Sequence, residues 1–441
     1  GWKEEPGLEG IESQVIEVRR GSKGNIKRVK LGFMVDLPPL GYKVYRLEQR
    51  KRGSNHEIKV KQNEVENPFL TVKVDPETGI IEVLDKRGKL LVKGNELNIE
   101  NEIGDLYYHR YMFFELIKNE SGEGLRYGAF KPKSFKIENG PLKSKIIFES
   151  EYYCLRWPYR MLDKLTPQLY RYKVMNIAKE VVIYRDLPRI EFITKVDNKY
   201  PNIRLRVKFD TKKERMVYFR ETQFGVVPEP TEQFAIAGEK KEKPAGIPNF
   251  LSWFCHGDGT RGVTFMNKGI PATEIREGSV YLTLFRSVAS LSADGEAGPL
   301  VPTPDALELR DYSFEYALQH HDGDWKQSEA YNHGQEFHHS PLAVQTTSEG
   351  DLPQELSFLE LKPSNLILSA LKKAEDSDEV ILRFFETKGE ETLAELELFR
   401  EIERATVADL LEREEYELKV SHNRLRMEVK PFEIVTLKLK L

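Results

Sequence analysis

The stretch "FLTVKVDPETGIIEVLDKRGKLLV" (Phe69–Val92) decides the fold class. Apolar and polar residues alternate through "FLTVKVD" and again through "IIEVLD", which is the period of a half-buried β-strand. The sequences "PETG" and "KRGK" stand between the apolar runs and are typical of tight turns between paired strands. We therefore predict three consecutive antiparallel strands in this stretch.

The same alternation recurs along most of the chain, for example in "EVVIYRDLPRIEFITKVD", "IRLRVKFD", "SVYLTLFRS" and "DYSFEYALQH". Valine, isoleucine, tyrosine and phenylalanine fill these runs, as a pleated and half-buried surface requires. Helical pattern is scarce, and "ATVADLLEREE" (Ala405–Glu415) is compatible with two helical turns or with a loop between strands. Because strands do not alternate with helices, a parallel α/β fold is excluded. The predicted class is all-β, built from antiparallel sandwiches.

Three domains are predicted from the composition of the segments between strands. Residues 1–60 form a small β domain, residues 64–348 form a large β super-sandwich, and residues 355–441 form a C-terminal β-sandwich. The first boundary follows from the charged polar stretch "QRKRGSNHEIKVKQNEVE" that precedes Asn67, and the second from the polar stretch "TTSEGDLPQE" (Thr346–Glu355). A length of 441 residues exceeds what one ordinary core supports, so several domains are expected.

Composition excludes several classes of protein. The net charge is −4, from 67 basic and 71 acidic residues of interspersed sign, which argues against nucleic acid as a partner. No apolar run approaches the roughly 20 residues that span a bilayer. Two cysteines without a CxxC motif indicate a reducing compartment, so a cytoplasmic location is predicted. The 31% charged fraction is of the kind seen in thermophiles.

Two groups of residues are considered for chemistry on their own. Five of the nine histidines fall between His320 and His339, where they either bind a metal or lie in a polar turn and on a surface. Their spacing matches no known ligand frame, but a self-contained metal-dependent enzyme is one of three hypotheses. Cys154 and Cys255 stand beside aromatic residues. His256 follows Cys255 directly, and adjacent strand residues point to opposite faces, so structural cysteines are favoured over a nucleophile.

The stretch "EIGDLYYHRY" (Glu102–Tyr111) is the remaining candidate. A tyrosine offers a flat apolar face and a hydroxyl, and both suit a sugar, which stacks through its C–H face and exchanges hydrogen bonds. The competing interpretation is an aromatic patch across neighbouring strands. Composition alone favours the patch.

Several stretches together resemble a known family, in order, along almost the whole chain. They are "LPPLGYKVYRLE", "ENPFLTVKVDPETGIIEVLDKRGKLLV", "EIGDLYYHR", "YRDLPRIEFITKVDN", "TRGVTFMNKGIPATEIREGSVYLTLFRSV", "FEYALQHHDGDW" and the tail from Leu366 onward. These segments resemble the C-terminal β region of glycoside hydrolase family 38, the α-mannosidases. One departure is His320, which stands where the family usually has proline.

The resemblance implies a large antiparallel super-sandwich of the galactose-mutarotase type, flanked by smaller β-sandwich domains. It also implies that a catalytic domain and a three-helix bundle precede this β region. The zinc ligands and the aspartate nucleophile of the retaining reaction lie in that first domain, and no segment here matches it. By the same resemblance Tyr107 and Tyr108 reach the sugar cleft, Asp105 sets their turn, and Arg286 donates hydrogen bonds to sugar hydroxyls.

The expected function is therefore the non-catalytic β-sandwich portion of an α-mannosidase-like enzyme, with no catalytic residue, metal or cofactor of its own. Zinc is expected in the catalytic domain that is missing here. The expected partners are an α-mannoside carbohydrate and either the protein's own N-terminal catalytic domain or a separate catalytic subunit. A freestanding carbohydrate-binding protein is the alternative, and homo-oligomerisation is left open. The chain begins with Gly1, as a fragment or a processed product would.

Overall fold

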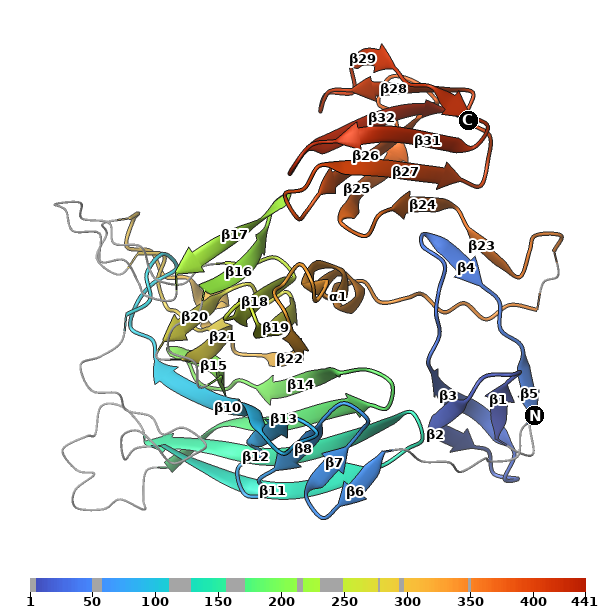
Figure 1. The fold of residues 1–441 in the computed structure, drawn as a ribbon. Coiled ribbons are helices and arrows are strands. Elements are labelled where there is room, and N and C mark those ends of the chain that lie inside the picture. The colour runs from blue at the N-terminus through green and yellow to red at the C-terminus, as the bar shows by residue number, and fades with distance from the viewer. Residues whose placement is uncertain are drawn as a thin grey trace. The chain divides into compact units, whose positions relative to one another are not determined.

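The computed structural model describes residues 5–49, 58–110, 128–155, 171–211, 217–230, 249–276, 278–292, 297–347 and 350–441. Almost all regular structure within these ranges is antiparallel β-sheet, which confirms the predicted all-β class (Figure 1). The chain divides into two compact units. The larger one contains Gly53–Arg220 and Pro228–Ala330, and the other contains Gly1–Arg52, Glu221–Val227 and Tyr331–Leu441.

Two large sheets make up the super-sandwich. The first has eight strands, in the order β20 (Thr273–Arg276), β21 (Ser279–Arg286), β15 (Ile203–Asp210), β10 (Leu90–Asn101), β9 (Ile81–Leu84), β8 (Thr71–Val74), β7 (Glu64–Glu66) and β6 (Lys59–Lys61). The second has nine, in the order β11 (Gly128–Glu138), β12 (Lys143–Leu155), β13 (Arg171–Tyr184), β14 (Arg189–Asp197), β22 (Asp311–Asp322), β19 (Arg261–Lys268), β18 (Trp253–Gly257), β16 (Val217–Thr222) and β17 (Gly225–Pro230).

The opening stretch forms β8, β9 and the start of β10, as predicted. Asp75 makes the first turn, because its carboxylate accepts the N–H of Glu77 at 2.9 Å and the hydroxyl of Thr78 at 2.9 Å. Asp85 makes the second turn in the same way, and accepts the N–H of Arg87 and that of Lys89. These short aspartate-centred turns fix the register of the three strands.

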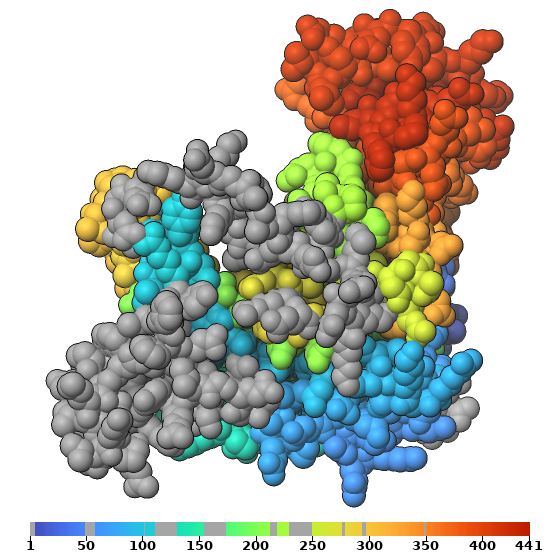
Figure 2. Space-filling view, turned by 60° about the vertical axis from the view of Figure 1, so that its left-hand side comes forward, coloured from blue at the N-terminus to red at the C-terminus, as the bar shows by residue number. Residues whose placement is uncertain are grey.

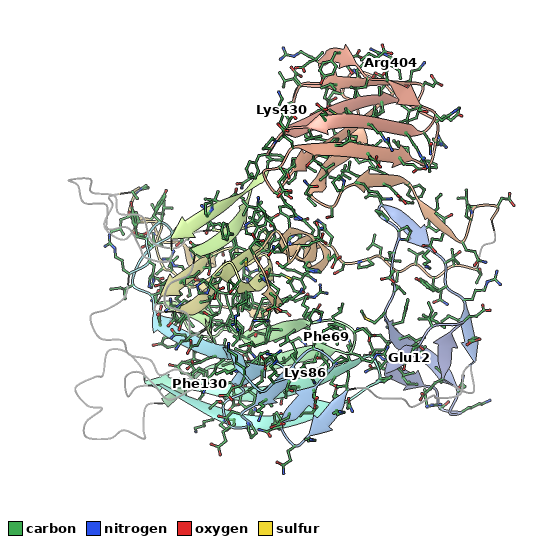
Figure 3. All side chains as sticks on the ribbon, viewed as in Figure 1. Glu12, Phe69, Lys86, Phe130, Arg404 and Lys430 are labelled. Carbon is green, nitrogen blue, oxygen red and sulfur yellow. The ribbon has the colours of Figure 1, made fainter. Side chains whose placement is uncertain are left out.

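One hydrophobic core lies between the two large sheets. In β10 alternate residues are buried there, so Leu97 and Ile99 lie beside their pairing partners Val207 and Leu205 of β15 on the inner face of the first sheet. Phe130 packs on Tyr152 at the edge of this core, with ring centroids 4.7 Å apart (Figure 3). The residues between the buried ones point to the outer face of the sheet, which carries the charged side chains considered below.

A second sandwich forms the C-terminal part of the chain, as predicted. Its five-stranded sheet has the order β25 (Leu366–Lys373), β26 (Val380–Glu386), β32 (Ile434–Lys440), β28 (Arg404–Ala408) and β29 (Glu414–Glu417). Its four-stranded sheet has the order β24 (Leu359–Lys362), β27 (Thr392–Leu398), β31 (Arg424–Val429) and β30 (Val420–Ser421). Leucines, valines and Phe384 fill the space between the two sheets.

Three small ribbons complete the strands of the described residues: β1 (Pro6–Leu8) with β5 (Leu47–Gln49), β2 (Ser13–Arg20) with β3 (Ile26–Phe33), and β4 (Gly41–Lys43) with β23 (Glu355–Ser357). The last pair joins a strand near residue 42 to the strand that directly precedes the C-terminal sandwich, and Tyr42 donates a hydrogen bond to the carbonyl of Pro353 at 2.8 Å. This pairing explains why residues near the N-terminus group with the C-terminal sandwich. The division into three domains, 1–60, 64–348 and 355–441, stays a prediction.

Helices are rare, as the pattern indicated. The described residues contain one α-helix, α1 (Ala330–His338), and one 3₁₀ turn, Pro304–Leu307. The helix α1 was not predicted from the sequence. The segment Ala405–Glu415 is not helical, because Asp409 accepts the N–H groups of Leu411 and Arg413 and folds a turn between β28 and β29. None of the helices in the described ranges is long and apolar enough to cross a membrane.

Candidate functional site

The loop from Glu102 to Arg110, called the arm here, follows β10 directly. Its backbone folds back on itself. The N–H of Ile103 donates to the carbonyl of Arg110, and the N–H of Asp105 donates to the carbonyl of Tyr108, both at 2.9 Å. The carboxylate of Asp105 is buried and accepts the N–H of Tyr107 at 2.9 Å and that of Tyr108 at 2.7 Å. Asp105 therefore sets the turn, as expected of an aspartate in this position.

The side chains at the tip of the arm point outward. Tyr107 is 55% exposed and Tyr108 is 43% exposed, and neither lies in a strand. The ring of Tyr107 runs beside Gly298, since a Cβ added there would sit 3.7 Å from the tyrosine oxygen. Figure 2 shows the cyan surface of the chain near residue 100 close to the amber surface near residue 300. The arm thus presents aromatic surface to solvent and is not an aromatic patch across strands.

The carboxylate of Glu102 holds the backbone of the arm in place. The side chain is fully buried. Oε1 accepts the N–H of Gly104 at 2.9 Å and that of Arg110 at 3.1 Å. Oε2 accepts Nε of Arg286 at 2.8 Å and lies 2.6 Å from Nδ1 of His109. Burial acts to raise the pKa of this carboxyl, but the bonds from His109 and Arg286 outweigh it and lower the pKa to about 2.

Arg286 comes from β21, 184 positions along the chain from Glu102. It meets the arm because β15 pairs with both β10 and β21, so that Arg204 faces Glu100 on one side and Arg286 on the other. Its Nη2 donates to the carbonyls of Asp105 at 2.8 Å and Tyr108 at 2.9 Å. Its side chain is 24% exposed, and the structure shows no partner for Nη1 among the described residues. The structure thus brings Arg286 and the arm together, whereas their contact with a sugar stays a prediction from the family resemblance.

A cluster of buried charges lies next to this anchor, on the outer face of the same sheet. Arg204 donates to Glu100 at 2.8 Å, and Arg206 bonds both Glu100 and Glu274. The guanidinium of Arg206 also stacks on the ring of Tyr281, 4.3 Å from its centroid. Burial lowers the pKa of Arg204, and the neighbouring charge of Arg206 acts in the same direction. Guanidinium groups suit such sites because their planar forks pair with carboxylates in fixed geometry.

Glu102 belongs to the candidate site but was not predicted from the sequence. A carboxylate two positions before a Gly-Asp turn carries no distinctive pattern, and its partner Arg286 is remote in sequence. The nearest signal is the spacing of Glu100 and Glu102, which places two carboxylates on one face of a strand and its continuation.

The described residues contain no group of three or more histidine, cysteine, aspartate and glutamate side chains placed to hold a metal ion. His320 and His321 lie in β22, whereas His333 and His338 belong to α1. Buried Cys255 is in no disulfide within the described part of the chain, and its sulfur lies 3.4 Å from Nε2 of His321. The side chain of Cys154 is outside the described residues.

The fold is that of two solved structures. An α-mannosidase from Enterococcus faecalis V583 superposes with a TM-score of 0.75 over 99% of this chain and 50% of its own, at 18% identity. A glycosyl hydrolase family 38 protein from Enterococcus faecalis superposes with a TM-score of 0.76 over 98% of this chain and 51% of its own, at 19% identity. The chain therefore spans about half the length of either structure.

Sequence comparison then identifies the family. The family model described as "Glycosyl hydrolases family 38 C-terminal domain" matches residues 65–304, and the one described as "Glycosyl hydrolases family 38 C-terminal beta sandwich domain" matches residues 365–437. The chain belongs to glycosyl hydrolase family 38 and corresponds to its C-terminal β region, which confirms the resemblance found in the sequence.

Two relatives are similar over 60% of this chain. A putative mannosylglycerate hydrolase from Halalkalibacterium halodurans is 26% identical over 269 residues, which are 29% of its length. Human alpha-mannosidase 2C1 is 23% identical over 271 residues, which are 24% of its length. The matched region is thus a minor part of each relative.

Proposed function

We propose that this chain is the non-catalytic β-sandwich portion of an α-mannosidase-like glycoside hydrolase. In this role it scaffolds a zinc-dependent, retaining catalytic domain that is not in this chain, and it lines one side of the sugar cleft. The family membership and the names of the relatives, a putative mannosylglycerate hydrolase and an alpha-mannosidase, support a mannoside as the substrate. The expected partners are an α-mannoside and the N-terminal catalytic domain of the same protein or a separate catalytic subunit.

The arm is the observation that carries this proposal. Its backbone is fixed by Asp105, Glu102 and Arg286, while Tyr107 and Tyr108 remain open to solvent. A rigid loop that exposes two tyrosines costs little conformational entropy when it binds a ligand. The rings offer flat faces to the C–H surface of a sugar, and the hydroxyls exchange hydrogen bonds with it. Nη1 of Arg286 supplies a further donor for a sugar hydroxyl.

The described residues do not fit the zinc site that the family resemblance implies, since they hold no cluster of metal ligands. Following the family resemblance, we assign zinc and the carboxylate nucleophile to the catalytic domain and derive no step through them. The groups of this chain act by binding and orienting the sugar. The hypothesis of a self-contained metal enzyme built on His320–His339 gains no support from the geometry.

The test is hydrolysis of an aryl α-mannoside by the purified chain, alone and together with a catalytic domain of the family. We expect no turnover by the chain alone and zinc-dependent turnover by the combination. Turnover by the isolated chain would refute the non-catalytic assignment. Binding of α-mannosides by the chain alone, with no gain in activity when the catalytic domain is added, would favour the alternative, a freestanding carbohydrate-binding protein.

A further inference from the structure

The carboxylate of Glu102 connects both ends of the arm. The N–H of Gly104 at its beginning and the N–H of Arg110 at its end donate to the same oxygen, Oε1, at 2.9 Å and 3.1 Å. Bonds from buried backbone donors are costly to lose, because no water replaces the acceptor. Opening the arm at either end therefore breaks a hydrogen bond to the buried carboxylate of Glu102.

The second oxygen of the same carboxylate fixes the backbone at the tip of the arm through Arg286. Oε2 accepts Nε of Arg286, and the Nη2 of that arginine bonds the carbonyls of Asp105 and Tyr108. The guanidinium is planar and its nitrogens keep fixed relative directions. A shift of the carboxylate thus turns the whole guanidinium and displaces the two carbonyls that flank Leu106 and Tyr107.

The side chain of Glu102 packs directly against the backbone of the rest of the arm. A Cβ added to Gly104 would lie 1.9 Å from the carbonyl oxygen of Tyr108 and 2.7 Å from Oε1 of Glu102. Glycine is required here because the turn, the carboxylate and the tyrosine backbone are in close contact. The position of the carboxylate is consequently transmitted to the tyrosines by direct packing as well as by hydrogen bonds.

The charges around Glu102 require an anion at this position. His109 is placed between Glu102 and Glu100, with Nε2 3.8 Å from the second carboxylate. The charged groups on the neighbouring strands are Glu100 on β10, Arg204 and Arg206 on β15, Glu274 on β20 and Arg286 on β21. With Glu102 ionised, the cluster holds three carboxylates and three guanidinium groups. A neutral side chain at this position leaves a buried positive charge uncompensated.

We propose that Glu102 is a positioning residue, which fixes the arm so that Tyr107 and Tyr108 meet an α-mannoside in one geometry. The inference rests on the proposed function, because it assumes that the arm contacts the sugar. Glu102 itself is buried and touches no substrate. It acts through the backbone of the arm and through Arg286, so its loss should weaken substrate binding more than it slows the chemical step.

The decisive variant is Glu102→Gln, which keeps the shape but replaces one acceptor oxygen by an N–H₂ donor that faces other donors. Glu151→Gln is the matched control. Glu151 also has a pKa lowered to about 2, through bonds from Lys173, Tyr153 and Lys133, but it lies on β12 in the other large sheet. Both variants remove one strongly paired carboxylate, and only the first adjoins the arm.

The first measurement is hydrogen exchange of the backbone amides in the purified chain, which needs no activity. We expect Glu102→Gln to speed exchange at Gly104, Tyr107, Tyr108 and Arg110 by about tenfold or more, while Glu151→Gln keeps wild-type rates there. Arg286→Lys should produce the same signature at Tyr107 and Tyr108, because a single ammonium nitrogen lacks the planar fork that joins the carboxylate of Glu102 to both carbonyls. This half-buried position also provides the test if Glu102→Gln fails to fold.

The second measurement uses the chain combined with a family catalytic domain and an aryl α-mannoside. We expect Glu102→Gln to raise KM by about tenfold and to lower kcat by less than about threefold. In the Tyr107→Ala, Tyr108→Ala background the same change should add little, because its effect passes through those rings. Glu151→Gln should match the wild type in both constants.

Wild-type amide exchange in Glu102→Gln would overturn the inference. A loosened arm with an unchanged KM would also overturn it, while leaving the proposed function intact. Failure of the proposed function looks different: the wild-type combination would then show no mannosidase activity, although the arm of Glu102→Gln exchanges faster.

Discussion

Two buried glutamates organise loops in this molecule, one in each compact unit, and their donors differ. Glu386, at the end of β26, is fully buried and accepts five neutral donors, which are the N–H groups of Lys388, Gly389, Glu390 and Phe432 and the amide of Asn365. Glu102 accepts two backbone N–H groups and also faces an arginine and a histidine. Burial works to raise the pKa of both carboxyls, and bonds from their donors lower it.

The difference separates a structural role from a role in positioning. The loop that Glu386 holds turns the chain between strands of the C-terminal sandwich, and its donors carry no net charge. The loop that Glu102 holds exposes two tyrosines, and its geometry also depends on the guanidinium of Arg286 from β21. A buried carboxylate is therefore not informative by itself, and the groups that it orients decide what it does.

The largest effect is expected for Glu386→Ala, which leaves five donors without their acceptor. We expect the free energy of unfolding of the C-terminal sandwich to fall by about 4 kcal/mol. Hydrogen exchange of amides in β26 and β32 measures this loss locally. Glu386→Gln, which retains one acceptor oxygen, should lose less. A loss below about 1 kcal/mol for the alanine variant would contradict the structural role.

The difference in unfolding free energy between the wild type and Glu102→Gln should depend on pH. The pKa of Glu102 is lowered from 4.5 to about 2, so its contribution is complete above the unfolded value and is lost as pH falls from about 4.5 toward 2. The contribution is up to about 3 kcal/mol of unfolding free energy. Chemical unfolding of both proteins over this range measures the difference, which should shrink as pH falls. A difference that stays constant with pH would speak against the ionised anchor.

Removal of an exposed tyrosine should change activity and not stability. We expect Tyr107→Ala or Tyr108→Ala to lower kcat/KM of the complete enzyme by about tenfold, since stacking and one hydrogen bond are lost. The free energy of unfolding should change by less than about 0.5 kcal/mol, because both side chains are half exposed. Unchanged kinetics in both variants would remove the arm from the sugar cleft.

The smallest effect is expected for exposed ion pairs. Arg426 pairs with Glu395 at 2.8 Å, but the two side chains are 70% and 46% exposed. Arg426→Ala should cost less than about 0.5 kcal/mol in thermal or chemical unfolding. By comparison, Arg286→Ala leaves the buried Glu102 without its guanidinium and should cost about 3 kcal/mol. Equal costs would mean that burial does not separate these two pairs.

The strands of the fold were predictable because each shows its own local pattern. The alternation in Phe69–Val92 and its turn aspartates specify β8, β9 and β10 without information from elsewhere. The helix α1 and the turn after β28 were not predictable with equal ease. The helix is short and its pattern is weak. The turn has a sequence compatible with a helix, and it is fixed by bonds that the carboxylate of Asp409 accepts together with backbone bonds between Asp409, Glu412 and Arg413.

Only part of the candidate site was predictable from the sequence. Tyr107, Tyr108 and Asp105 stand together in sequence, so their turn could be read directly, and Arg286 was suggested by family resemblance alone. The pairing of Glu102 with Arg286 depends on β15 lying between β10 and β21. Strand order of this kind is set by the packing of the whole sheet, and no local pattern encodes it.

The atoms that hold the tip of the arm have a further consequence. Arg286 bonds the carbonyls of residues 105 and 108, and Asp105 bonds the amides of residues 107 and 108. On the arm, these contacts use the main chain of positions 105, 107 and 108 and the side chain of Asp105, but no side chain of positions 106 to 108. The three side chains at the tip can therefore diverge among related sequences, or be replaced by design, while the backbone that carries them keeps its shape. The backbone conformation of the arm is thus independent of the side chains at its tip.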